Sequence, residues 1–484
     1  MKILFLIISV VLLSSFLFVS DDKVNNSEEN LVLPSEAQQR YQEMEVIGFL
    51  HFNMNTFTDK EWGVGDEDPI LFSPTNLSTD QWASVAKQAG LGELILTAKH
   101  HDGFCLWPSQ FTDHCIKNSP YKNGKGDIVK EFVNSCRKQN LKVGLYLSPW
   151  DRNHKDYGTK EYLNYYRNQL TELLTNYGDV NELWLDGANG GSGFYGGAKD
   201  ERKIDPATYY EWDKTIGIAK HLQPKIMIFS DAGPDIHWIG NENGYAGETF
   251  WSTINTNKLV IGASDTKYLN QGDSAGKQWV IGQCDVSVRP GWFYHQLEDT
   301  LVKTARELVD LYYKSVGRNA LLLLNIPPDQ HGCIGERDKR NLIEFRRILD
   351  ETFQHNLVKD AMAITATKSV RNIEDILDAD NATFWISEDK KNTAEIIVSL
   401  KGRKCFNRIM LQEPIRLGQR ISSFVIYAKI KDEWKSISEG TTIGYKRLIR
   451  IPAVETNQVK IVINGLRAAP GISSFGLYKA SERE

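Results

Sequence analysis

An acidic residue, Asp186, ends one of the most apolar segments of the chain. It follows Leu183, Trp184 and Leu185 directly and is followed at once by Gly187. In a strand, alternation places the two leucines on one face and Trp184 with Asp186 on the other. Because a buried carboxylate is costly, the segment predicts an acid carried to an opening of the fold. Gly187 would let the chain turn away there without covering the acid.

Other apolar segments also end in residues that can do chemistry. They are His51, with Glu61 and Trp62 soon after, His100, His101, Tyr146, and the acids Asp231, Asp235, Glu242 and Glu248. Each has a structural alternative, because a single histidine at a strand end can be purely structural and a single Asp there is commonly a helix N-cap. Capping does not require all of them to converge, whereas an active site does.

Three chemistries could use such a set of residues. Glycoside hydrolysis needs two carboxylates, with aromatic and histidine groups around a sugar. Metal-assisted hydrolysis would use His51, His100, His101 and Asp186 as ligands, although no His-x-His pair ends the first apolar segment. A non-catalytic carbohydrate-binding protein is the third class, and it would not need two acids at one site.

The apolar segments that carry these residues are typical of buried strands separated by helices. The strand-like segments are 46–52, 92–98, 142–148, 182–187, 225–231, 278–283 and 320–326, and the helix-like segments include 78–90, 128–140, 159–178 and 300–317. Strands that are apolar on both faces indicate a parallel sheet covered by helices. The pattern predicts a (β/α)8 barrel, whose catalytic residues lie at the carboxyl ends of the strands. We expect the remaining strand near 245–262. A doubly wound sheet is the alternative, but no GxGxxG turn follows the first strand.

The character of the chain changes after the barrel. Residues 353–484 contain short alternating segments, such as 394–400, 422–430 and 458–465, and few helical ones. This pattern predicts a β-sandwich. No linker rich in Pro or Ser separates the two parts, so we expect them to be docked. The predicted organisation is a catalytic barrel over 38–352 and an accessory sandwich over 353–484.

The N-terminus has the pattern of a secretory signal. Lys2 precedes the apolar run ILFLIISVVLLSSFLFVS, and a polar stretch follows. We predict a signal peptide over 1–20, a polar leader over 21–37, and export to the periplasm or the extracellular space. An uncleaved anchor is the alternative, and no other segment resembles a membrane span.

Composition and cysteine content limit the classes of partner and the cysteine chemistry that the sequence supports. The net charge is −5 and no basic block occurs, which disfavours a nucleic-acid partner. Twelve Trp and nineteen Tyr residues suit the faces of sugars as well as a large core. The six cysteines include no CxxC pair, and buried free thiols are favoured over a Cys105–Cys115 disulfide.

Taken together, the motifs resemble glycoside hydrolase family 29, the retaining α-L-fucosidases. They are His51-Phe52 with Glu61-Trp62-Gly63, TAKHHDGF (97–104), GLYLSPWD (144–151), LWLDG (183–187) and GPDIHWIGNENG (233–244). The resemblance covers about residues 45–330, and LDADNATFW (377–385) with EPIRLGQRISSFVIYA (413–428) resembles the accessory domain of the same enzymes. The long form of the 233–244 motif is similar to the branch that acts on α-1,3- and α-1,4-linked fucose.

The resemblance also implies roles for individual residues. Asp186 would be the nucleophile, and Glu242 is favoured as the acid/base over Asp231, Asp235 and Glu248. Sugar contacts are implied for His51, Glu61, Trp62, His100, His101 and Tyr146, and Trp184 and Trp292 are candidate aromatic walls, with core packing as the alternative role of Trp184. No cofactor or catalytic metal is implied, the partner is a fucosylated oligosaccharide or glycoconjugate, and no oligomeric state is predicted.

Overall fold

The structure is a computed structural model that describes residues 31–484 apart from 370, 379, 389–391 and 466. The predicted signal peptide and residues 21–30 of the polar leader lie outside the described residues. In the part that is described, no helix is both long enough and apolar enough to cross a bilayer.

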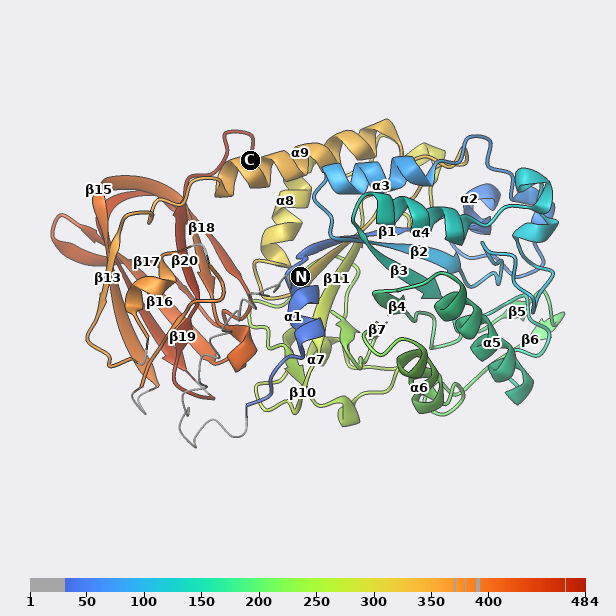
Figure 1. Ribbon diagram of the computed structural model, residues 1–484, viewed down its shortest axis with the longest axis horizontal. Coiled ribbons are helices and arrows are strands. Elements are labelled where there is room, and N and C mark those ends of the chain that lie inside the picture. The colour runs from blue at the N-terminus through green and yellow to red at the C-terminus, as the bar shows by residue number, and fades with distance from the viewer. Residues whose placement is uncertain (1–30, 370, 379, 389–391, 466) are drawn as a thin grey trace, which may run out of the picture.

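Eight parallel strands close into a barrel, which confirms the predicted fold class (Figure 1). Their order around the barrel is β1 (Val46–Leu50), β12 (Leu321–Asn325), β11 (Ile281–Ser287), β8 (Ile236–Trp238), β7 (Met227–Ser230), β4 (Glu182–Trp184), β3 (Lys142–Leu147) and β2 (Glu93–Lys99), which pairs with β1 again. Because all strands are parallel, their carboxyl ends meet at one mouth.

Helices cover the outside of this barrel (Figure 1). They are α3 (Thr79–Gln88), α4 (Ile128–Lys138), α5 (Lys160–Asn176), α6 (Trp212–Leu222), α8 (Ala305–Lys314) and α9 (Glu336–Phe353). Two short helices lie in connections: α2 (Met54–Thr58) follows β1, and α7 (Thr266–Gln271) lies between Thr253–Ile254 and Gln278–Trp279. Several begin where the sequence supplies a cap: the side chains of Ser78, Asp127 and Thr304 accept backbone N–H groups of the first turns of α3, α4 and α8. Such caps satisfy donors that the helix itself leaves unpaired.

Two strands differ from the sequence prediction. The eighth barrel strand is β8, at 236–238, and not a segment near 245–262. Residues Thr253–Ile254 (β9) instead pair antiparallel with Gln278–Trp279 (β10) outside the barrel, so the segment predicted at 278–283 is split and β11 runs on to Ser287. β8 has three residues, one of them His237, and lies between the turn-forming residues Gly233-Pro234 and Gly240, so it shows neither an apolar run nor an alternation.

Successive side chains of the β4 segment point to opposite faces of the barrel sheet, as expected of a strand. Trp184 packs inside the barrel with Phe49, Tyr146 and Phe229, whereas Leu183 and Leu185 belong to the core between barrel and helices. Helix α1 (Glu36–Gln42) contributes Tyr41 to the interior cluster. The hydroxyl of Tyr41 donates to Oε2 of Glu182 at 2.6 Å. Because Glu182 is the first residue of β4, this contact places α1 against the amino ends of the strands.

The C-terminal part is an antiparallel sheet domain, which confirms the predicted sandwich. Its main sheet has the order β13 (Met362–Thr365), β15 (Thr393–Gln412), β18 (Arg447–Gly465), β16 (Ile421–Ile430) and β17 (Glu433–Gly440), with β20 (Ser474–Tyr478) on β15 and a separate pair of β14 (Trp385–Ile386) and β19 (Gly471–Ile472). Register shifts in the pairing of β15 with β18 occur between Ser399 and Lys404 and between Phe406 and Arg408. Such irregularities bend long strands, and here β15 pairs with β13 through its first half and with β20 through its second.

The two domains are docked, as the absence of a linker predicted. Gln419 of the sandwich accepts the backbone N–H of Ser252 at 2.9 Å and donates to the carbonyl of Phe250 at 2.9 Å. Arg447 donates to Glu248 Oε2 at 2.8 Å. These contacts join the sandwich to the segment that follows β8.

Candidate active site

A cavity of about 560 Å³ opens at the carboxyl ends of the strands. Its lining includes His51, Glu61, Trp62, His100, His101, Trp184, Asp186, Asp231, Glu242 and Trp292, all of which the sequence had singled out. A larger cavity, of about 980 Å³, lies between α9 and the sandwich and is lined by none of them. The barrel therefore brings together residues that are up to 241 positions apart in the chain (His51 to Trp292).

Asp186 lies two residues after the end of β4, with its side chain 44% exposed in this cavity. The backbone N–H of Gly187 donates to Oδ1 at 2.6 Å, and the hydroxyl of Tyr146 donates to Oδ2 at 3.2 Å. Burial nevertheless raises the pKa of Asp186 to about 6, because the surrounding protein disfavours the charged form more than these two donors favour it. Asp186 is ionised at neutral pH, and its carboxylate faces the cavity.

The sharp turn after Asp186 needs a glycine. Gly187 has a φ of +76°, and a Cβ there would lie 2.6 Å from Cε1 of His101. A side chain at this position would be strained by the backbone and would collide with the histidine. The turn thus lets Asp186 and His101 approach, with Nε2 of His101 at 3.9 Å from Oδ2 of Asp186.

The four acids considered as partners of Asp186 separate into two groups. Asp235 accepts Lys220 at 2.5 Å and the backbone N–H of Ile228 at 2.9 Å, and Glu248 is held by Arg318 and Arg447. Neither lines the cavity.

Glu242 and Asp231 do line the cavity. Glu242 is exposed, and the indole N–H of Trp292 donates to its Oε2 at 3.2 Å. Asp231 accepts the backbone N–H of Gly262 through Oδ2 at 2.8 Å, while its buried Oδ1 makes no hydrogen bond in the described residues. Burial raises the pKa of Asp231 to about 6. Two of the four acids therefore have access to a bound sugar.

The three histidines of the cavity are uncharged at neutral pH. Burial lowers the pKa of His51 and of His101 to about 3, and it lowers the pKa of His100 well below its usual range. A neutral imidazole has one donor and one acceptor nitrogen. The hydrogen bond made by Nδ1 therefore decides what Nε2 offers to a ligand.

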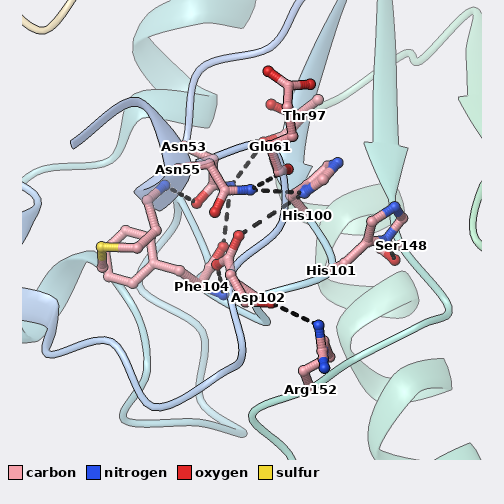
Figure 2. A network of polar contacts seen from close by, with 12 residues as sticks. Asn53, Asn55, Glu61, Thr97, His100, His101, Asp102, Phe104, Ser148 and Arg152 are labelled. Atoms are coloured by element: carbon pink, nitrogen blue, oxygen red, sulfur yellow. Dashed lines mark hydrogen bonds and ion pairs between the residues drawn. The ribbon is translucent and has the colours of Figure 1, made fainter. Parts of the chain in front are cut away.

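The partner of His100 fixes it as a donor toward the cavity. The amide of Asn55 donates to the carbonyl of Glu61 at 3.0 Å and to Nδ1 of His100 at 3.2 Å, as Figure 2 shows. Because Nδ1 of His100 accepts, its proton is on Nε2. Asn55 comes from α2, so the helix that follows β1 sets the tautomer of a residue that follows β2.

The hydrogen-bond partners of His101 and His51 accept from Nδ1 of each ring, so Nε2 of each ring is a hydrogen-bond acceptor toward the cavity. Ser148 donates its hydroxyl to the carbonyl of Trp150 at 2.6 Å. Its oxygen therefore accepts from Nδ1 of His101, at 2.7 Å; Figure 2 shows these two side chains together. Asn325 donates its amide to Trp292, and its Oδ1 accepts from Nδ1 of His51 at 2.8 Å. One donor and two acceptors on neighbouring side chains suit the hydroxyls of a sugar, each of which both donates and accepts.

Glu61 lines the cavity, and its carboxylate also contacts a neighbouring loop. Its carboxylate accepts the backbone N–H groups of Trp292 at 2.9 Å and Phe293 at 3.1 Å, and it lies 2.7 Å from Nε2 of His295. It lines the cavity, and it also holds the segment that carries Trp292. Tyr146 contacts Asp186 through its hydroxyl, and its side chain is fully buried.

Aromatic side chains form the floor and the rim of the cavity. Trp184, 5% exposed, stacks on Phe229 with ring centroids 4.0 Å apart, so it belongs to both the floor of the cavity and the barrel core. Trp62 is 61% exposed and meets Trp150 edge to face. Such surfaces suit the apolar faces of a sugar.

Two residues of the site were not singled out from the sequence. Asp285 lines the cavity on β11, accepts the indole N–H of Trp238 at 2.9 Å, and has its pKa raised well above the usual range by burial and by the charges of Glu242 and Asp186. Asn325, the last residue of β12, holds both His51 and Trp292. Both residues lie at strand ends, where function is expected, but the predicted strand 278–283 stops two residues before Asp285, whereas β11 continues to Ser287.

The described residues contain no group of three or more His, Cys, Asp or Glu side chains placed to hold a metal ion. The six cysteines are free, and Cys105 and Cys115 are both buried without being joined. The histidines of the cavity direct Nδ1 to protein partners and only Nε2 toward a ligand.

A sugar-sized cavity with several carboxyl groups, neutral histidines and aromatic walls, at the mouth of a (β/α)8 barrel, defines a glycoside hydrolase. Residues 33–351 match the family described as alpha-L-fucosidase, and residues 363–475 match the F5/8 type C domain. The chain belongs to the α-L-fucosidase family, and it is a glycoside hydrolase that acts on fucosylated glycans.

Relatives of similar length support the family. Alpha-L-fucosidase 1 of Arabidopsis thaliana is 43% identical over 93% of this chain and 88% of its own length. A glycoside hydrolase 29 family member from an unknown rumen bacterium is 43% identical, with a TM-score of 0.84 over 93% of this chain and 78% of that one. A Ruminococcus gnavus GH29 fucosidase, solved in complex with fucose, is 34% identical, with a TM-score of 0.84 over 93% of this chain and 95% of that one.

Proposed function

We propose that the enzyme removes terminal α-L-fucose by double displacement with retention of configuration. Asp186 attacks the anomeric carbon, the glycosidic bond breaks, and a covalent fucosyl-enzyme forms while Glu242 protonates the leaving oxygen. Glu242 then takes a proton from water, whose oxygen displaces Asp186 from the anomeric carbon. The observation that carries this proposal is the position of Asp186, ionised and exposed in the cavity at the end of β4.

Glu242 is proposed as the acid/base because it reaches the cavity from the segment after β8 and is open to both leaving group and water. Its contact with the indole N–H of Trp292 orients one oxygen. Asp231 and Asp285 also line the cavity, but Asp285 is buried and Asp231 is half-buried, and each already accepts a hydrogen bond from the protein, from Trp238 and from Gly262 respectively. They serve better as supports of the cavity wall than as groups that exchange protons with water.

Removal of each carboxyl tests the assignment. Asp186→Ala should lower turnover of an aryl α-L-fucoside by about 10⁴-fold or more while fucose still binds in calorimetry. Glu242→Ala should lose about 10²–10⁴-fold on oligosaccharides, far less on substrates with good leaving groups, and should regain activity with azide. Asp231→Ala and Asp285→Ala are the matched variants. Azide rescue in either of them, and not in Glu242→Ala, would move the acid/base to that residue.

We further propose a preference for α-1,3- and α-1,4-linked fucose. The support is the resemblance of residues 233–244 to that branch of the family; this segment includes β8 and supplies Glu242 and Trp238 to the cavity. Hydrolysis of matched α-1,2-, α-1,3-, α-1,4- and α-1,6-linked oligosaccharides measures the preference. Faster cleavage of the α-1,2 or α-1,6 compounds would contradict it.

The metal-dependent alternative predicts a different result in a simple assay. We expect full activity on an α-L-fucoside after treatment with a strong chelator. Activity lost to the chelator and restored by one divalent cation would favour the alternative.

We also propose that the protein is exported, to the periplasm or the extracellular space, after removal of residues 1–20. The support is the charged start, the apolar run and the polar stretch of the N-terminus. N-terminal sequencing of the protein from its natural host should begin near residue 21. A mature chain that keeps Met1 and sediments with membranes would indicate an anchor instead.

A further inference from the structure

One histidine at the mouth joins two loops and lies outside the cavity lining. His295 follows β11 in the segment that carries Trp292, and it faces the segment after α2. Its Nδ1 lies 2.6 Å from Oδ1 of Asp59, and its Nε2 lies 2.7 Å from Oε1 of Glu61. The side chain of His295 is 17% exposed, whereas that of Asp59 is 70% exposed, so the ring is held between one carboxylate at the surface and one at the cavity.

Both contacts can be hydrogen bonds only if the imidazole is doubly protonated. A carboxylate accepts, so each nitrogen must donate, and a neutral imidazole donates from one nitrogen alone. Among the described residues, Asp59 and Glu61 are the charged groups within hydrogen-bonding distance of the ring. Their negative charges and hydrogen bonds raise the pKa of His295 against the opposing effect of burial.

The carboxylate of Glu61 connects His295 to residues at the cavity. It accepts the backbone N–H groups of Trp292 and Phe293, the residues that precede His295 in the same loop. The indole N–H of Trp292 in turn donates to Oε2 of Glu242 at 3.2 Å. An unbroken series of contacts therefore leads from His295 through Glu61 and Trp292 to the proposed acid/base.

We propose that His295 is a positioning residue, whose protonated ring clamps the Trp292 loop to Asp59 and Glu61 and so holds Glu242 in place. The clamp is closed while the ring carries both protons, and it loses one hydrogen bond when the ring becomes neutral. Its effect on catalysis rests on the role proposed above for Glu242, whereas its effect on the loop does not.

The direction of the pH dependence follows from linkage. A group whose pKa is higher in the folded protein than the ordinary 6.5 of histidine contributes stability that is fully present below about pH 6.5. That contribution is lost as the pH rises through the higher value of the folded protein. The loop should therefore be tight at mildly acidic pH and looser at alkaline pH.

Hydrogen exchange of the backbone amides of Trp292 and Phe293 tests the clamp without any substrate. After correction for the intrinsic rate, the wild-type protein should lose about tenfold in protection, the worth of one charge-assisted hydrogen bond, between pH 6 and pH 9. His295→Gln should show the lower protection at both pH values. His355→Gln, which changes an exposed histidine just after α9, should behave as the wild type does.

Asp59→Asn is the second variant, and it decides the matter if His295→Gln does not fold. It removes one of the two charges but keeps an oxygen acceptor, so the loss of protection should move to lower pH. Protection that is the same in wild type, His295→Gln and Asp59→Asn at every pH would overturn the proposal. So would an unchanged midpoint in a folded Asp59→Asn.

The catalytic consequence is measured separately. At pH 6, His295→Gln should lower kcat/KM by about tenfold on fucosylated oligosaccharides, and by less on an aryl fucoside, which needs little help from the acid. The ratio of wild type to variant should shrink toward pH 9. Equal losses on both substrates at all pH values would overturn the link to Glu242. If the wild type hydrolyses no α-L-fucoside, the proposed function fails, and the exchange measurements still decide the clamp.

Discussion

Asp186 and the three histidines show how single residues acquire their chemistry from their neighbours. The histidines are neutral because burial removes the water that would stabilise a charge. Their tautomers follow from Asn325, Asn55 and Ser148, none of which contributes to the lining of the cavity. A sugar therefore meets a fixed pattern of donors and acceptors beside an ionised carboxylate.

Tyr146→Phe tests how the pKa of Asp186 is set. If Asp186 is the nucleophile, as we propose, it must be ionised, so kcat/KM should fall as the pH drops through about 6, the pKa of Asp186. The hydroxyl of Tyr146 stabilises the ionised form, so its removal should move this acidic limb up by about half a pH unit. The measurement is kcat/KM of an aryl α-L-fucoside from pH 4 to pH 8. A limb that stays in place, or moves down, would show that the hydrogen bond does not act on Asp186.

At the scale of elements, the site depends on where strands end. Strand β4 ends at Trp184, and the chain turns at once through Gly187. Strand β12 ends in Asn325, which holds residues of two other loops. The helices supply support from outside, as Asn55 of α2 does for His100. Some strand ends thus place groups in the cavity, as β4 does with Asp186, and others place groups that hold a neighbour, as β12 does with Asn325.

Gly187→Ala tests the turn after β4. The added Cβ meets His101 and the φ of +76° disfavours a side chain, so we expect a loss of about 2 kcal/mol in the free energy of unfolding. kcat/KM should fall by more than about tenfold, because a small displacement of Asp186, the proposed nucleophile, is costly. Urea unfolding and steady-state kinetics give both values.

Gly217→Ala is the matched control, because α6 leaves open space around Gly217. Alanine there should stabilise the protein by up to about 1 kcal/mol and leave kcat/KM unchanged. Equal behaviour of the two variants would mean that the turn has no special role.

At the scale of the whole molecule, side chains of the sandwich contact the barrel at several points. Glu45, just before β1, accepts the hydroxyls of Tyr312 from α8 at 2.5 Å and Tyr445 from the sandwich at 2.9 Å, and it pairs with Lys446. Arg447 and Arg318 share Glu248 across the same interface. In Figure 1, α9 runs along the top of the molecule from the barrel toward the sandwich. We propose that the sandwich acts chiefly as a support of the barrel.

Glu45→Gln tests this support. The change removes the charge that pairs with Lys446, so we expect the free energy of unfolding at pH 7 to fall by about 1–3 kcal/mol. Lys446 and three hydrogen bonds hold the pKa of Glu45 below its ordinary 4.5. Its contribution is therefore present above about pH 4.5 and lost as the pH falls through the lower value, and the difference from wild type should shrink there.

Glu43→Gln, two residues away and exposed, is the control and should change stability by less than about 0.5 kcal/mol. Denaturant unfolding at several pH values measures all three proteins. A Glu45→Gln variant as stable as the control would show that the interface contributes little.

The sequence by itself determined the elements and the residues that end them. Apolar runs of five to seven residues between amphipathic helices carry enough periodicity to indicate a parallel barrel, and Asp186, His51, His100 and His101 stand out because polar residues are rare at the ends of such runs. The prediction from sequence was wrong for short segments and for the end of one strand. The three residues of β8 show almost no pattern, and the misplaced end of β11 hid Asp285.

Only the tertiary structure decided which polar groups meet. The strand-end pattern alone does not distinguish Asp231, Asp235, Glu242 and Glu248, and only the family resemblance favours Glu242. In the structure, Lys220 pairs with Asp235 and Arg447 pairs with Glu248, and neither acid lines the cavity. The sequence also could not show that Glu61 holds the Trp292 loop, or which nitrogen of each histidine carries a proton. These properties depend on contacts between residues far apart in the chain and on the loss of water around them, and a linear pattern contains neither.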